Sequence, residues 1–243
     1  MAIELSIIQQ RGTIFIPKFI AYSIEQAKNY SDLLQGAKPL PVPLPTPLGV
    51  QGVQQPDALQ NGGIWQLVRG ILRVVFYPNR VDIVKDWISP RHVKEEDEFL
   101  SLCSTIFSTI LSREQVTASR VAYAPIFARD KDSSFSDKMM WDVIFKNPSF
   151  CDSLPNEVSV TRNYRVNQML KEREITLNFR STFGSANHAL PDGTVSTGSV
   201  LVSFDINSIP DSDYRFDQEM LRCFFDSALL FSDKMYNYFI EEK

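Results

Sequence analysis

The sequence changes twice from a two-residue to a three-or-four-residue repeat of apolar side chains, and this change restricts the folds open to the chain. A two-residue repeat is typical of a half-buried strand, and the longer repeat is typical of a helix with one apolar face. The strand patterns cover residues 64–69, 71–77, 80–86, 157–167, 174–183 and 199–207, and the helix patterns cover residues 95–111 and 211–238. We therefore predict an α+β fold, in which each of two antiparallel β-meanders is followed by a long helix. The two units would share one continuous sheet with its helices on one face.

Residues 61–243 are expected to form a single α+β domain, and residues 1–60 to pack on it as a leading segment of strand, helix and proline-rich strap. The helix pattern of the leading segment covers residues 19–34. Weak similarity between residues 61–150 and 151–243 predicts that the domain consists of two pseudo-repeats.

In the strap, proline takes every second position from Pro39 to Pro47. Proline fixes φ and removes a backbone hydrogen-bond donor, so this segment must be extended. A proline-rich strand can protect one edge of an open sheet, because it presents few free donors. We expect the strap to pack on the protein's own surface or to serve as an ordered linker.

The composition is that of an ordinary globular protein, with 44% hydrophobic residues among 243 and a formal net charge of −4. A chain of this length can bury a sizeable core without disulfide or metal staples. Its three cysteines are far apart, and no Cys-x-x-Cys pair exists to hold zinc. Neither a secretory signal nor a membrane-spanning apolar run is recognisable. These observations predict a cytoplasmic protein without a membrane span.

No arrangement of residues in the sequence is typical of a catalytic site. The two histidines, His92 and His188, fall in loop-like segments, and no serine has a Gly-x-Ser-x-Gly setting. No phosphate-binding loop motif occurs. We therefore expect no catalytic residue, metal or cofactor, and we favour a non-catalytic binding or interaction protein, such as a sensor or adaptor.

Arginines on the predicted strands suggest an alternative function. If they share one face of the sheet, they form a basic surface that can bind phosphates or single-stranded nucleic acid. Acids such as Asp82, Asp130 or Asp205 could then make this surface an enzyme that processes nucleic acid or a phosphate ligand. The candidate ligand-binding residues are Arg120, Arg162, Arg165, Arg173, Arg180, Tyr123 and Tyr164, and Arg69, Arg73 and Arg80 lie on the earlier hairpin. Nucleic acid is the less favoured partner, because the whole chain is negative.

The helix over residues 95–111 carries small uncharged side chains opposite its apolar face, namely Ser104, Thr105, Ser108 and Thr109. A solvated helix face usually carries charges, so these residues are the candidate partner-binding surface. We expect a homodimer or a complex with another protein, and an unpaired sheet edge is a further surface for such contacts.

The order of these segments resembles a sporadically distributed, uncharacterised bacterial protein family of similar length. The resemblance rests on residues 64–86, the helix over 95–111 and the strand over 116–123 with Arg120 and Tyr123, and it extends to the closing strand and helix. An asparagine typical of the family is absent near Pro125. The resemblance implies no catalytic residues, and the patchy distribution of the family suggests a role in host defence.

Overall fold

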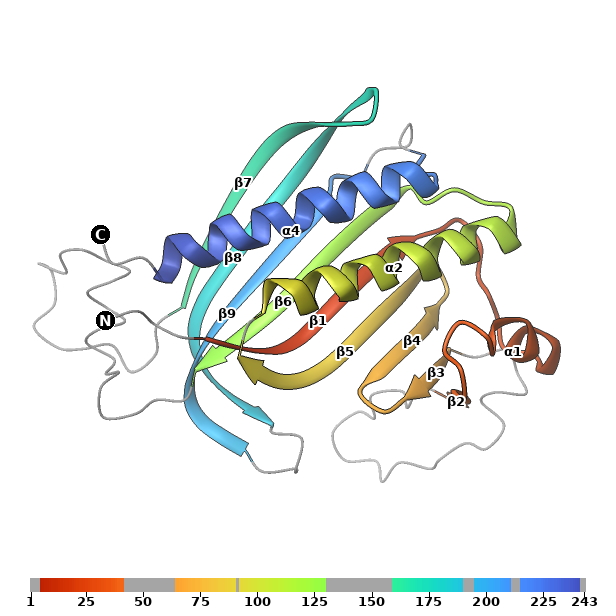
Figure 1. Cartoon of the computed structure of the whole chain (residues 1–243), viewed down its shortest axis with the longest axis horizontal. Helices are drawn as coiled ribbons and strands as arrows, with labels where there is room; N and C mark the ends of the chain where they lie inside the picture. The colour runs from red at the N-terminus through yellow and green to blue at the C-terminus, as the bar shows by residue number, and fades with distance from the viewer. Residues whose placement is uncertain are drawn as a thin grey trace, which may run out of the picture.

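A computed structural model of the chain describes residues 5–41, 64–90, 92–129, 159–189, 195–210 and 215–240. These residues form a nine-stranded sheet in which all neighbouring strands are antiparallel (Figure 1). Two long helices lie across one face of this sheet (Figure 1). The structure therefore confirms the predicted α+β fold, with one continuous sheet and helices on one face.

The elements follow the predicted order, in which each meander is followed by a helix. The strands are β1 (Ser6–Phe15), β2 (Lys38–Pro41), β3 (Trp65–Arg69), β4 (Leu72–Tyr77), β5 (Arg80–Pro90), β6 (Arg120–Arg129), β7 (Ser159–Leu170), β8 (Arg173–Ala189) and β9 (Val195–Ser208). The helices are α1 (Ile24–Tyr30), α2 (Val93–Glu114) and α4 (Gln218–Ile240). Across the sheet the order is β2-β3-β4-β5-β1-β6-β9-β8-β7. The two meanders thus flank the central pair β1–β6.

β1 is the central strand of the sheet, so the expectation that residues 1–60 pack on a separate body is wrong for this strand. It pairs with β5 on one side and with β6 on the other. Its sequence pattern is irregular because the register shifts between Ile7 and Gln9, and because Gln10 and Gly12 take positions that face the helices. A Cβ atom at Gly12 would lie 2.7 Å from the Cys103 Sγ atom, so α2 packs directly on the backbone of β1.

The remainder of the leading segment contains less helix than predicted. α1 begins after Ser23, whose hydroxyl accepts a hydrogen bond of 3.0 Å from the backbone N–H of Gln26. Gly36 adopts a φ of +77° in the turn that precedes β2. β2 pairs with β3 at one edge of the sheet, where the strap begins with Pro39 and Pro41. The rest of the strap lies outside the described residues.

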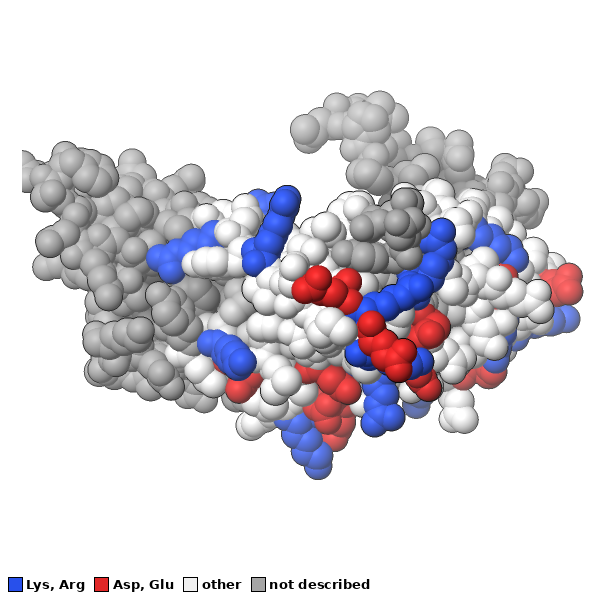
Figure 2. All heavy atoms as spheres, turned by 90° about the horizontal axis from the view of Figure 1, so that it is seen from above, with Lys and Arg blue, Asp and Glu red and all other residues white. Residues whose placement is uncertain are grey.

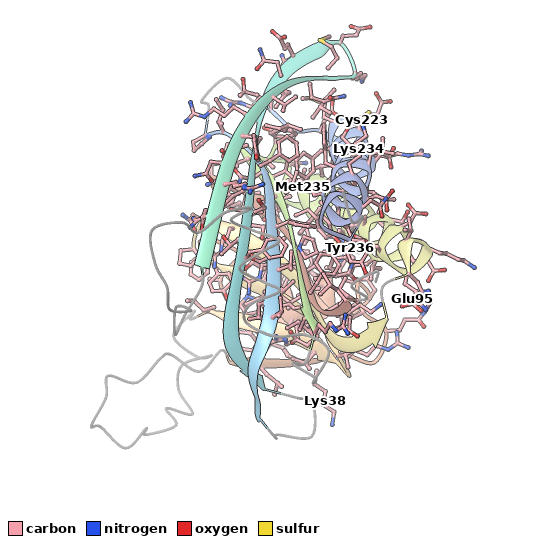
Figure 3. The ribbon with its side chains drawn as sticks, turned by 90° about the vertical axis from the view of Figure 1, so that its left-hand side faces the viewer. Lys38, Glu95, Cys223, Lys234, Met235 and Tyr236 are labelled. Atoms are coloured by element: carbon pink, nitrogen blue, oxygen red, sulfur yellow. The ribbon has the colours of Figure 1, made fainter. Side chains whose placement is uncertain are left out.

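Both long helices bury their apolar faces against the sheet, as their sequence patterns predict. In the edge-on view, Glu95 of α2 and Tyr236 of α4 lie on the same side of the sheet (Figure 3). The two helices also contact each other through Phe107 and Phe225, whose ring centroids are 6.1 Å apart. The core therefore lies between the helix pair and one face of the sheet.

A buried polar cluster connects both helices to the two central strands. Glu96 in the first turn of α2 accepts hydrogen bonds from the Tyr123 hydroxyl of β6 at 2.8 Å and from Ser232 Oγ of α4 at 2.6 Å. Gln10 of β1 donates to the same tyrosine hydroxyl at 3.0 Å. Burial, reinforced by the Glu96 carboxylate, raises the pKa of Tyr123 well above its ordinary value, so this hydroxyl remains a donor. A buried carboxylate requires such donors, and they fix the helices relative to the sheet.

We predict that Phe224→Asp unfolds the protein, whereas Phe19→Asp does not. Phe224 is fully buried on α4, and Phe19 is 37% exposed. An unpaired charge in the core costs several kcal/mol, against a total stability of about 5–15 kcal/mol for a typical domain. Urea denaturation followed by circular dichroism would measure both variants. A Phe224→Asp variant as stable as the wild type would contradict the assignment of the buried face of α4.

Candidate functional site

The face of the sheet that points away from α2 and α4 gathers arginines from six strands. Residues directly opposite each other on paired strands share a face, and so do alternate residues along one strand. Because Gly12 faces α2, its neighbours Arg11 and Thr13 face the other way. From β1, the register of each strand pair then identifies the residues on this same face in the strands on both sides. We call the following group the arginine face: Arg11, Arg73, Arg80, Arg120, Arg165 and Arg180. The acids on the same side are Asp82, Asp86, Glu174 and Asp205.

Only three of the seven predicted ligand-binding residues lie on the arginine face, namely Arg120, Arg165 and Arg180. Tyr123 is three residues from Arg120 on the same strand, so it points to the opposite side, where it is fully buried in the polar cluster.

The same parity separates Arg162 and Tyr164 from Arg165 on β7. Arg162 lies opposite Ser181, and Tyr164 lies opposite Phe179, which faces the core. Arg173 pairs with Leu170 at the end of the β7–β8 hairpin, and it too is off the arginine face. Residues of one strand share a face only when an even number of positions separates them. This rule, applied to each predicted strand, would have assigned Arg162 and Tyr164 to the opposite face from Arg165.

At one end of the arginine face, aromatic rings and guanidinium groups alternate across four strands. Tyr77 of β4 lies opposite Arg80 of β5, which lies opposite Phe15 of β1, which lies opposite Arg120 of β6. The Arg80 guanidinium stacks over Tyr77 at 4.4 Å from the ring centroid, and Arg120 stacks over Phe15 at 5.0 Å. These cation–π contacts orient both guanidinium groups on the sheet.

Beside this row lies Asp82, a carboxylate that is only 2% exposed. Thr13 Oγ1 donates a hydrogen bond of 3.0 Å to it, and Arg80 Nε lies 3.4 Å away without forming a hydrogen bond. Burial raises the pKa of Asp82, although the charges of Arg80 and Arg11 act in the opposite direction. The Nε atoms of both arginines are buried and have no hydrogen-bond partner. Two arginines therefore lie beside a buried carboxylate on this face, whereas Asp130 lies outside the described residues.

Sequence reasoning missed Arg11, Thr13 and Phe15, which form the centre of this face. Their alternation is visible in the sequence. This alternation did not lead to a predicted site, because the strand was expected to lie outside the main sheet.

The second candidate surface is the outer edge of β7. β7 is the last strand in the sheet order, and it has no described neighbour beyond it. The β7–β8 hairpin extends past α4, as the upper part of Figure 1 shows. Three large apolar side chains on it are exposed: Tyr164 by 53%, Val166 by 37% and Met169 by 57%. We call this strand border the β7 edge.

The predicted partner-binding residues lie together beside a groove between α2 and α4. Ser104, Thr105, Ser108 and Thr109 line its α2 wall, and Gln218, Glu219 and Arg222 line its α4 wall, around a volume of about 570 Å³. Thr105 and Thr109 donate their hydroxyls to backbone carbonyls one turn earlier, at 3.0 Å and 2.9 Å. These two hydroxyl protons are therefore already used within α2.

Comparison with known proteins adds no family assignment. The sequence matches no protein-family model, and no curated protein matches it significantly. The resemblance to a sporadic bacterial family, with its suggested defence role, therefore stays a prediction. Among the described residues, no three His, Cys, Asp or Glu side chains gather to hold a metal ion, and no described helix is long and apolar enough to cross a membrane.

We predict that the stability difference between the wild type and an Asp82→Asn variant depends on pH. Because the pKa of Asp82 is raised in the folded state, its protonation favours folding, and this contribution is lost as the pH rises through the folded-state pKa. The free energy of unfolding of the wild type, minus that of the variant, should therefore increase as the pH is lowered from about 7 to about 4. Urea titrations at several pH values would measure it. A constant or decreasing difference would contradict the assigned environment of Asp82.

Proposed function

We propose that this protein is a non-catalytic interaction protein that binds an extended segment of a partner protein along the β7 edge. The observation that carries the proposal is a 12-residue edge strand with exposed apolar side chains and no described neighbour on its outer side. Unpaired N–H and C=O groups on such an edge can form a ladder with an added strand.

The contrast between the two edges of the sheet supports this proposal. At the opposite edge, β2 has only four residues and includes Pro39 and Pro41, which cannot donate to an added strand. Residues 159–170 contain no proline, glycine or acid, so β7 lacks the common protective features of an exposed edge except for its two arginines. The sequence therefore protects one edge and leaves the other competent for pairing.

The side chains of β7 also offer a place to bury part of the partner. Tyr164 lies opposite Phe179, and Phe179 packs against Phe231 of α4 with 4.3 Å between ring centroids. Tyr164 and Val166 thus extend the apolar side of the sheet beyond the cover of α4. An added strand with apolar residues on this side would bury them, and its main chain would supply affinity.

We predict that Val166→Lys abolishes partner binding, whereas Val93→Lys does not. Both valines are exposed, by 37% and 45%, but Val93 is the first residue of α2. A charge on the apolar side of the edge strand opposes the addition of a neighbour. Tagged wild type and both variants would be used to recover partners from the source organism. Hydrogen exchange would then test whether the recovered partner protects residues 159–170.

A partner that binds the wild type and Val166→Lys equally, or that leaves residues 159–170 unprotected, would refute the proposal. Light scattering would identify a second copy of this chain as the occupant of the β7 edge. In that case the mass of the wild type would rise with concentration and that of Val166→Lys would not.

A further inference from the structure

The arginine face carries a positive excess that the composition of the whole chain conceals. Its six arginines oppose four acids, although the chain has a net charge of −4. On the side seen from above, charges of both signs are interleaved (Figure 2). Within the described residues, Arg73 pairs with Asp86 and Arg80 lies near Asp82, but Arg11, Arg120, Arg165 and Arg180 form no ion pair. Of these four, Arg11 lies near enough to Asp82 for its charge to act on that carboxyl, and Arg180 lies opposite Asp205, so Arg120 and Arg165 are the arginines farthest from acid neighbours on this face.

Arg120 is held in place without being neutralised. Its Nε donates to the Ser208 carbonyl oxygen at 3.0 Å, and its Nη2 donates to Asn207 Oδ1 at 2.9 Å. Both acceptors are uncharged, and the Phe15 ring supports the guanidinium from one side at 5.0 Å. A fixed guanidinium with its charge intact is suited to phosphate, because little side-chain entropy is lost on binding.

The arrangement around Arg120 also suits planar groups. The row Tyr77, Arg80, Phe15 and Arg120 presents two aromatic rings and two oriented guanidinium planes on one side of the sheet. Unpaired bases stack on aromatic rings and on arginine planes, and antiparallel sheets are common platforms for such stacking.

The extent of the arginine face favours a chain-like ligand. Its arginines span from β4 to β7, which is seven strands or roughly 30 Å across the sheet. Asn163 and Asn167 lie on the same side of β7 as Arg165, and their amide groups can donate to base edges, although Asn167 Oδ1 already accepts a hydrogen bond of 3.0 Å from Thr176 Oγ1. A small phosphate ligand would contact only one part of this surface.

We infer that the arginine face binds single-stranded nucleic acid, with Arg120 and Arg165 contacting phosphates and the aromatic row contacting bases. This site goes beyond the proposed function, because Tyr164 and Val166 of the β7 edge are on the opposite side of the sheet from the arginine face, although Met169 shares the side of Arg165. A duplex keeps its bases stacked internally and would not use the aromatic row.

Fluorescence anisotropy of the full-length protein with a labelled single strand of about 20 nucleotides tests the inference. We expect Arg165→Gln to weaken binding about 3–10-fold and to lower the salt dependence by roughly 0.7 in log–log slope. Arg162→Gln is the matched control, because it removes the same charge from the opposite side of the same strand, and it should bind like the wild type. Arg120→Gln should weaken binding further, and circular dichroism would confirm that it folds.

Four results would overturn the inference. The first is the absence of binding at about 100 µM protein in low salt, where even non-specific complexes form. The second is equal weakening by Arg162→Gln and Arg165→Gln, and the third is equal affinity for duplex and single strand. The fourth is displacement of the probe by polyglutamate as effectively as by unlabelled single strand. Unchanged nucleic-acid binding by Val166→Lys would distinguish this site from the β7 edge.

Discussion

The structure depends on the pairing of β1 with both β5 and β6. Without this strand, the meanders β3–β5 and β7–β9 would belong to two sheets, each with an additional unpaired edge. β1 fits the central position because its helix-facing residues, Gly12 and Gln10, suit the residues that pack on them. Gly12 admits the close approach of α2 at Cys103, and Gln10 joins the hydrogen-bonded cluster of Glu96. A large apolar side chain at Gly12 would separate the helix from the sheet.

The placement of both long helices on one face divides the sheet into two chemically different sides. One side is filled by the aromatic and aliphatic residues of the core, and Glu96, Tyr123 and Ser232 bind the layers together. The other side keeps arginines, amides and the buried Asp82. Because side chains alternate along a strand, a difference of one residue decides whether an arginine joins this second side or faces the helices. Arg165 and Arg162 illustrate this on a single strand.

The two candidate sites use different properties of the same hairpin. The β7 edge offers unpaired main-chain groups and an apolar extension of the core, which suit a polypeptide strand. The arginine face offers charge and stacking planes, which suit a polyanion with exposed bases. Arg165 belongs to the second and Tyr164 to the first, although they are adjacent in sequence. The groove between α2 and α4 is a weaker candidate, because the hydroxyl protons of Thr105 and Thr109 are already donated within the helix.

The sequence by itself determined the local structure: the hairpins over residues 64–86, the long helices and the extended, edge-forming character of the segment at Pro39 and Pro41 follow from apolar spacing and proline chemistry. It also placed Arg120, Arg165 and Arg180 among the candidates. Tertiary structure alone decided that β1 is central and that Tyr123 is buried. The apolar periodicity of a sequence indicates that a strand has two different sides. It does not predict which strands pair with it or on which side the helices pack. Those choices depend on contacts between residues far apart in the chain, such as Gly12 with Cys103.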